Sequence, residues 1–174
     1  MNMELKNYVR TIENYPIDGI SFKDITTLFK EPNAFKSVVD QISEFYKDKG
    51  ITKIVSLESR GFIVGGAVAY RINAGFVPIR KKGKLPAAVL SESYELEYGV
   101  DSIEIHVDAL NEDDIVLIHD DLLATGGTAL AALNLVKQLN VKKIYFSFIV
   151  DLTFIQTDKK KELAEYDAHS VIQY

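Results

Sequence analysis

The sequence predicts an α/β fold built on a mostly parallel sheet. Four short runs are rich in β-branched or other apolar residues, as strands buried on both faces are: residues 51–57, 76–80, 115–119 and 144–150. Two helix-length segments that begin with glycine, residues 61–72 and 127–139, lie between them. Because the order strand, turn, helix, strand occurs twice, we expect right-handed crossovers between parallel strands.

Two further elements frame this pattern. Apolar residues recur at helical spacing over residues 35–46, with Asn33 available as an N-terminal cap and Gly50 as a terminator. Residues 88–106 alternate loosely between apolar and polar side chains, so we interpret them as an exposed hairpin or a long flexible loop.

Composition limits the possible functions. The chain has 174 residues, 47% of them hydrophobic, which suffices for one core but not for two ordinary domains. It contains no cysteine, which excludes disulfides, thiolate metal sites and a cysteine nucleophile. The net charge of −5 argues against a general nucleic-acid binder, which needs a positive field. Neither a signal peptide nor a long apolar segment is evident, so we expect a cytoplasmic protein without membrane spans.

The most informative stretch is residues 115–133, IVLIHDDLLATGGTALAAL. It combines a buried strand, a turn of small residues and a helix, and ligands of open α/β sheets bind beyond the carboxyl ends of such strands. Backbone N–H groups and two hydroxyls could hold a phosphate at the turn, which consists of Ala124, Thr125, Gly126, Gly127 and Thr128. Without further residues, the same turn could equally be a tight connection in which Thr128 caps the helix.

Two adjacent acids, Asp120 and Asp121, favour the functional interpretation. We expect them to end the strand, where two neighbouring carboxylates repel each other unless a cation or hydroxyl donors lie beside them. A ribose diol, or Mg²⁺ near it, would meet that need. The absence of Gly-Lys-Ser/Thr and of Gly-x-Gly-x-x-Gly excludes a triphosphate P-loop and a dinucleotide fingerprint.

Basic residues follow the two preceding strands and should lie at the same sheet edge. Arg60 could bind a phosphate in a bidentate manner, although alone it would be expected to pair with Glu58 or another acid. Residues 80–84 hold four basic side chains in five positions, which would neutralise a polyanionic ligand.

Residues 115–133 closely resemble the phosphoribosyl pyrophosphate motif of type I phosphoribosyltransferases, with His119 where an apolar residue is usual. The resemblance is specifically to the adenine branch of that family, and it is carried by the following segments: residues 19–25, 58–62, 77–86, 93–99, 103–110 and 170–174. It implies the type I fold in one domain, with a small base-side hood at residues 1–34 and a flexible catalytic loop at residues 88–106.

The resemblance also implies a role for each candidate residue. Asp120 and Asp121 would hold the ribose hydroxyls and residues 124–128 the 5-phosphate, with Mg²⁺ near the two acids and the donor pyrophosphate. Further donor-binding residues would be Ser59, Arg60, Arg80, Lys81 and Lys84. Catalytic residues would be Arg60, Glu97 and Tyr98, with Glu97 as the proton carrier. Base-binding residues would be Ser21, Phe22, Lys23 and Leu152.

The implied activity is purine salvage: adenine and 5-phosphoribosyl 1-pyrophosphate would give AMP and pyrophosphate, in a homodimer. Two departures concern the base side, namely Lys23 where arginine is common and residues 153–158 where a Leu-x-Gly-Arg pattern is typical. A transferase for hypoxanthine, guanine or xanthine therefore stays open, as does a regulator that senses the donor without reacting.

Overall fold

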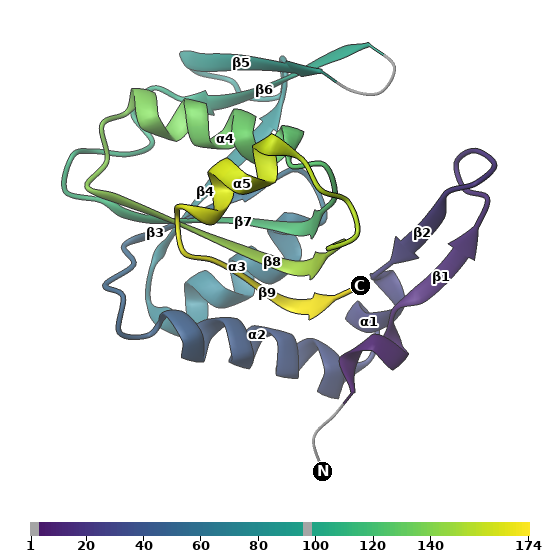
Figure 1. Cartoon of the computed structure of the whole chain (residues 1–174). Helices are drawn as coiled ribbons and strands as arrows, with labels where there is room; N and C mark the ends of the chain where they lie inside the picture. Colours follow the sequence, from purple (N-terminus) through teal and green to yellow (C-terminus); the bar gives the residue numbers. More distant parts are fainter. Residues whose placement is uncertain (1–3, 96–98) are drawn as a thin grey trace.

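The fold is centred on a seven-stranded sheet with the order β5-β6-β4-β3-β7-β8-β9, as the computed structural model shows for residues 4–95 and 99–174 (Figure 1). Five neighbouring strands are parallel: β4 (Gly75–Lys81), β3 (Lys53–Leu57), β7 (Ile115–Leu123), β8 (Lys143–Asp151) and β9 (Ala168–Gln173). The hairpin β5 (Val89–Glu95) and β6 (Val100–His106) is added antiparallel to β4. The α/β class and the mostly parallel sheet are thus confirmed.

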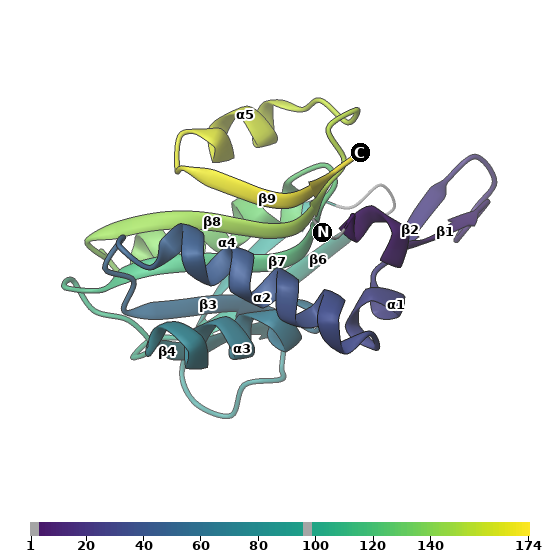
Figure 2. The same cartoon turned by 90° about the horizontal axis from the view of Figure 1, so that it is seen from below.

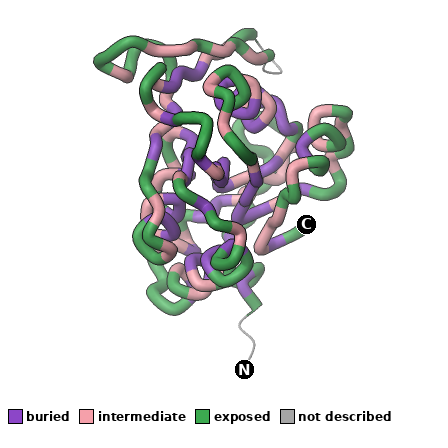
Figure 3. The backbone as a smooth tube through the Cα atoms, turned by 90° about the vertical axis from the view of Figure 1, so that its left-hand side faces the viewer, coloured by how far each residue is buried: buried purple, intermediate pink, exposed green. Residues whose placement is uncertain are grey.

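Helices cover both faces of the sheet. On one face lie α2 (Pro32–Tyr46) and α3 (Gly61–Ile72), and on the other lie α4 (Gly127–Gln138) and α5 (Asp158–Ala164) (Figures 1 and 2). The buried residues form two clusters, one on each side of the central strands. Figure 3 shows buried segments, in purple, in the interior of the molecule. The described helices include none that is long and apolar enough to cross a membrane.

The N-terminal segment forms a small layer of its own. It consists of the 3₁₀ turn η1 (Leu5–Tyr8), the antiparallel pair β1 (Arg10–Glu13) and β2 (Ser21–Asp24), and the short α1 (Thr26–Phe29). Arg10 pairs with Asp24 across the two strands, and hydrogen bonds from Thr26 and Arg10 lower the pKa of Asp24. Figure 1 shows the pair projecting beyond the carboxyl ends of β7 and β8.

Three sequence predictions need correction. Helix α2 begins at Pro32, so Asn33 lies inside its first turn; proline suits that position because the first N–H groups of a helix have no intrahelical partner. The helix ends at Tyr46, and Gly50 instead turns the chain toward β3 with φ +69°. Strand β7 runs to Leu123, because it keeps pairing with β8 beyond the two acids.

Candidate active site

The predicted donor-site residues gather at the carboxyl edge of the sheet. Glu58, Ser59 and Arg60 follow β3, Arg80 lies near the end of β4, and Asp121 lies in β7. Strand β3 is hydrogen-bonded to both β4 and β7 in parallel register, so these segments are neighbours although they are far apart in sequence.

An ion pair joins the segment after β3 to strand β7. The Arg60 Nε atom donates to Asp121 Oδ2 at 2.6 Å, and the Asp121 backbone N–H donates to Asp120 Oδ1 at 2.9 Å. Arg60 therefore pairs with an acid of the phosphate motif and not with Glu58. This connection fixes the guanidinium beside the two carboxylates.

Asp120 is electrostatically strained. Burial, together with the neighbouring Asp121 charge, raises its pKa well above the usual range, and Arg60 offsets this only in part. The helix after β3 packs directly against this carboxylate, because a Cβ on Gly61 would come 3.1 Å from Asp120 Oδ1. Hydroxyl donors or a cation at this position would stabilise the ionised form.

The predicted phosphate turn leads into α4 as expected. Gly126 is the N-cap residue with φ +86°, a conformation that strongly favours glycine. Gly126 and Gly127 are buried, whereas Thr125 is exposed and Thr128 half-buried. The backbone N–H groups at the start of the helix have no intrahelical acceptor, which suits them to an anion.

The basic segment after β4 is held by acids. Arg80 pairs with Glu58 at 3.1 Å and also donates to the Lys84 carbonyl, and Lys81 Nζ lies 3.1 Å from Asp101. The hydrogen bond from Arg80 lowers the pKa of Glu58. Lys84 is exposed, and so is Ser59 on the neighbouring segment. The basic segment thus lies at the predicted edge, but Arg80 and Lys81 are already paired with acids.

Phe22 on β2 of the N-terminal layer contacts this cluster. The Arg60 guanidinium carbon lies 5.8 Å from the centre of the Phe22 ring, and Tyr15 meets that ring edge-on at 5.2 Å. On the same strand, Ser21 bonds to Glu13 and Lys23 to Thr11 of β1.

Leu152 lies just beyond β8. It is buried, and its N–H donates to the Leu123 carbonyl at 3.0 Å. Lys23 Nζ lies 4.5 Å from the centre of the Tyr174 ring. Phe22 and Leu152 thus both lie near the carboxyl edge of the sheet, and the side chain of Leu152 is buried there.

Comparisons with known proteins identify the family. The family model for the phosphoribosyl transferase domain matches residues 24–171. An adenine phosphoribosyltransferase of Brachyspira hyodysenteriae is 46% identical over 172 residues, which are 99% of this chain and 100% of the relative. One from Bacteroides thetaiotaomicron is 59% identical over 144 residues, 83% of this chain and 82% of that protein. This chain belongs to the adenine phosphoribosyltransferase family.

Solved structures of the family have the same fold. The enzyme of Thermoanaerobacter pseudethanolicus superposes with a TM-score of 0.92 at 45% identity, covering 98% of both chains. The Giardia lamblia enzyme, solved as a complex with 9-deazaadenine, has a TM-score of 0.92 at 38% identity and covers 98% of this chain and 96% of its own. The type I fold predicted from the sequence is thereby confirmed.

The family's loop acid and tyrosine, Glu97 and Tyr98, lie outside the described residues. The hairpin that leads to them crosses α4, where Asn134 donates to Glu92 at 2.9 Å. A Cβ on Gly127 would come 3.7 Å from the Glu95 carbonyl, so the end of β5 lies beside the phosphate turn. The roles of Glu97 and Tyr98 stay predictions.

Helix α5 is a part of the site that the sequence did not predict. The Thr157 hydroxyl donates to the Thr125 carbonyl at 2.7 Å and also caps α5 by accepting from the Lys160 N–H. Lys160 binds the Asp151 carboxylate at 2.6 Å and the Leu152 carbonyl at 2.9 Å. A sequence signal was available, because Thr157 followed by Asp158 is typical of a helix N-terminus.

Two adjacent carboxylates at the donor edge could contact a metal ion. The residues that the structure describes include no group of three His, Asp or Glu side chains placed to hold a metal. Mg²⁺ commonly takes one or two carboxylates and completes its shell with water and substrate phosphates. Asp120 and Asp121 fit that requirement.

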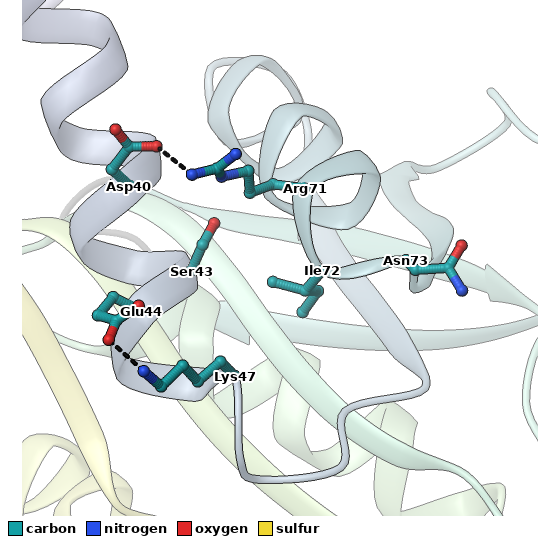
Figure 4. Close-up of a pocket in the computed structure, with 7 residues that line it drawn as sticks. All are labelled: Asp40, Ser43, Glu44, Lys47, Arg71, Ile72 and Asn73. Atoms are coloured by element: carbon teal, nitrogen blue, oxygen red, sulfur yellow. Dashed lines mark hydrogen bonds and ion pairs between the residues drawn. The ribbon is translucent and has the colours of Figure 1, made fainter.

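The cavity in Figure 4 is separate from this site. It lies between α2 and the C-terminal end of α3, where Arg71 Nη2 is 3.4 Å from Asp40 and Lys47 pairs with Glu44. Since α3 starts at the carboxyl edge of the sheet, its end lies near the opposite edge. The predicted site residues do not line this cavity.

Proposed function

We propose that this chain transfers the 5-phosphoribosyl group of 5-phosphoribosyl 1-pyrophosphate to adenine, giving AMP and pyrophosphate in purine salvage. The observation that carries the proposal is the placement of Asp120 and Asp121 in one strand directly before the glycine turn of α4, with Arg60 bonded to Asp121. Membership of the family supports the choice of adenine.

In this proposal the donor lies along the carboxyl edge. The carboxylates of Asp120 and Asp121 accept hydrogen bonds from the ribose hydroxyls, and the backbone of residues 124–128 binds the 5-phosphate. Hydroxyl donors would stabilise the ionised form of Asp120, whose pKa is raised by burial and by the neighbouring Asp121 charge. The two ribose hydroxyls would therefore lie where the carboxylates of Asp120 and Asp121 need hydrogen-bond donors.

The reaction breaks the bond between C1 and the pyrophosphate oxygen and forms a bond between C1 and a purine nitrogen, which then loses its proton. Negative charge gathers on the leaving pyrophosphate and positive charge on the ring. The charge on the pyrophosphate is stabilised by Arg60 and Arg80, together with Ser59, Lys81 and Lys84. The charge on the ring is stabilised by Asp120 and Asp121. Bound Mg²⁺ would neutralise further charge on the pyrophosphate.

Glu97 accepts the proton that the purine loses, and Tyr98 belongs to the same loop. The position of Glu95 beside the phosphate turn supports this assignment, because the chain leaves β5 next to the proposed donor. General base catalysis by such a group is worth about 10²- to 10⁴-fold. Closure of the loop would exclude water, which would otherwise hydrolyse the donor.

The base lies against the hood. Phe22 offers an aromatic face next to Arg60, and buried Leu152 offers an apolar surface from the end of β8. We assign the polar contacts to Ser21 and Lys23, which lie on the same strand as Phe22. In this proposal, these base-binding residues give the enzyme its preference for adenine over the 6-oxopurines.

The test is direct. The protein is mixed with donor, Mg²⁺ and adenine, and AMP and pyrophosphate are measured, with hypoxanthine, guanine and xanthine as competitors. We expect AMP as the product and no effect of the competitors. Product from a 6-oxopurine alone would move the enzyme to that class, and donor binding without product from any purine would favour a sensor.

We further propose a homodimer. Ile63 and Tyr70 are seven residues apart on α3 and therefore share a face; Tyr70 is 91% exposed and Ile63 is 47% exposed. Phe76 on the neighbouring β4 is also exposed and packs against Phe62. Burial of these apolar side chains against a second copy of the chain would be favourable. Sedimentation should give twice the chain mass, and a Tyr70→Glu variant should be monomeric.

We place the enzyme in the cytoplasm. Its proposed donor and product carry several negative charges, and such molecules do not enter an apolar bilayer unaided. Cell fractionation with an antibody to the chain tests this assignment.

A further inference from the structure

The three consecutive lysines of α5 differ in what they contact. Lys160 binds Asp151 at 2.6 Å, and Lys161 binds Asp158 at 2.8 Å. Lys159 makes no hydrogen bond or ion pair with any residue in the described ranges 4–95 and 99–174. It is half-buried, and its ammonium group has no acid partner among the described residues.

Lys159 lies against the phosphate turn. A Cβ on Gly126 would come 3.4 Å from Lys159 Cβ, so the backbone of the two segments is in close contact. A Cβ on Gly127 would lie 3.8 Å from Lys159 Nζ and also 3.8 Å from Thr125 Oγ1. The ammonium and the hydroxyl therefore flank the same point at the start of α4.

Among the residues that the structure describes, the other cations near the proposed phosphate site, Lys160 and Arg60, are already paired with acids. Residues 124–128 offer backbone N–H groups and two hydroxyls, which stabilise an anion but leave a phosphate dianion with no formal positive charge beside it. Lys160 is committed to Asp151, and Arg60 is bonded to Asp121. In a chain with a net charge of −5, the field of the whole protein does not replace a local cation.

We propose that Lys159 binds the 5-phosphate, with its ammonium group contacting the phosphate of both the donor and the AMP product. This inference rests on the proposed function, because the turn is taken as the phosphate site. Lysine suits the role, since it acts as a mobile point charge with three donors. Lys159 is a binding residue, and the chemical step does not depend on it.

The test compares Lys159→Gln with Lys161→Gln, which removes the same charge from the same helix two residues away. For Lys159→Gln we expect the KM for the donor and the inhibition constant of AMP each to rise about tenfold, the usual effect of losing one charge-assisted hydrogen bond. The kcat, the KM for adenine and inhibition by pyrophosphate should not change, because adenine and pyrophosphate carry no 5-phosphate. Lys159→Arg should restore most of the loss.

The outcomes separate the two proposals. An active wild type with an unchanged donor KM in Lys159→Gln would overturn this inference alone. Equal weakening of AMP and pyrophosphate, or an equal effect of Lys161→Gln, would also overturn it, since a general field would then explain the data. If the wild type forms no AMP from adenine, the proposed function fails; ribose 5-phosphate binding by calorimetry then tests Lys159 directly, and equal affinities of wild type and Lys159→Gln would refute its role.

Discussion

His119 gives a prediction whose size follows from its surroundings. It lies fully inside the sheet, and neither ring nitrogen has a hydrogen-bond partner among the described residues. Its neighbours in register are Ser56 on β3 and Ser147 on β8, so a polar row crosses the sheet under α3. A Cβ on Gly65 of α3 would come 3.3 Å from the ring, which leaves no room for bulk water.

Burial lowers the pKa of His119 from 6.5 to about 4, because the charged imidazole would lose its hydration. Between these two values the unfolded chain binds a proton that the folded chain does not bind. The free energy of unfolding therefore falls as the pH is lowered through this range. At about 1.4 kcal/mol per pKa unit, His119 alone removes about 3 kcal/mol between pH 6.5 and 4.

Other groups titrate in the same range, so the measurement must be a difference. The raised pKa of Asp120 gives a slope of the opposite sign, and the lowered pKa of His169 gives one of the same sign. We compare His119→Val with the wild type by urea unfolding at pH 7, 6 and 5. The stability of the variant relative to the wild type should rise by about 1 kcal/mol or more per pH unit below 6.5.

Ser147→Ala is the matched control. It removes the partnerless hydroxyl next to His119 but no titrating group, so its effect on stability should be the same at every pH. Equal pH slopes for His119→Val and the wild type would refute the reasoning. So would an NMR titration of His119 that is centred near pH 6.5.

The remaining predictions concern the donor site. Gly126→Ala should cost about 1 kcal/mol of stability and raise the KM for the donor, because φ is +86° at this position and the new Cβ would lie 3.3 Å from α5. Gly127→Ala should have little effect on stability, because its new Cβ would make only ordinary contacts. Chemical denaturation and steady-state kinetics of the two variants check both expectations. Donor affinity measured by calorimetry should rise with pH through the raised pKa of Asp120, and Asp120→Asn should remove that dependence. Glu58→Gln should free Arg80 and change donor affinity but not the KM for adenine, and an unchanged donor affinity would contradict this.

The sequence predicted best those features that depend on local composition. β-branched runs buried on both faces identified the parallel strands, and an initial glycine identified α3 and α4 to within a residue. Strand β9 was missed because its residues, AHSVIQ, are partly exposed and include His169 and Ser170. The short pair β1–β2 was missed for a similar reason, since only Asp24 in it is buried.

The contacts of the site depend on topology, which local patterns do not specify. From the sequence, Arg60 could pair with Glu58, two residues away, or with an acid anywhere beyond. The structure pairs it with Asp121 because β3 lies beside β7. The same holds for Thr157, whose bond to the Thr125 carbonyl joins positions that only the return of the chain through β8 brings together.

The ion pairs of the site have a consequence for how a polyanion binds there. Arg60, Arg80 and Lys81 are each bonded to an acid, so their charges are compensated before any ligand arrives. A pyrophosphate must therefore exchange partners with these acids, and the gain is the difference between two charge-assisted interactions. The acids orient the cations in advance, which reduces the entropy lost on binding. Lys159 has no such partner among the described residues, so in our proposal no acid competes with the phosphate for its ammonium group.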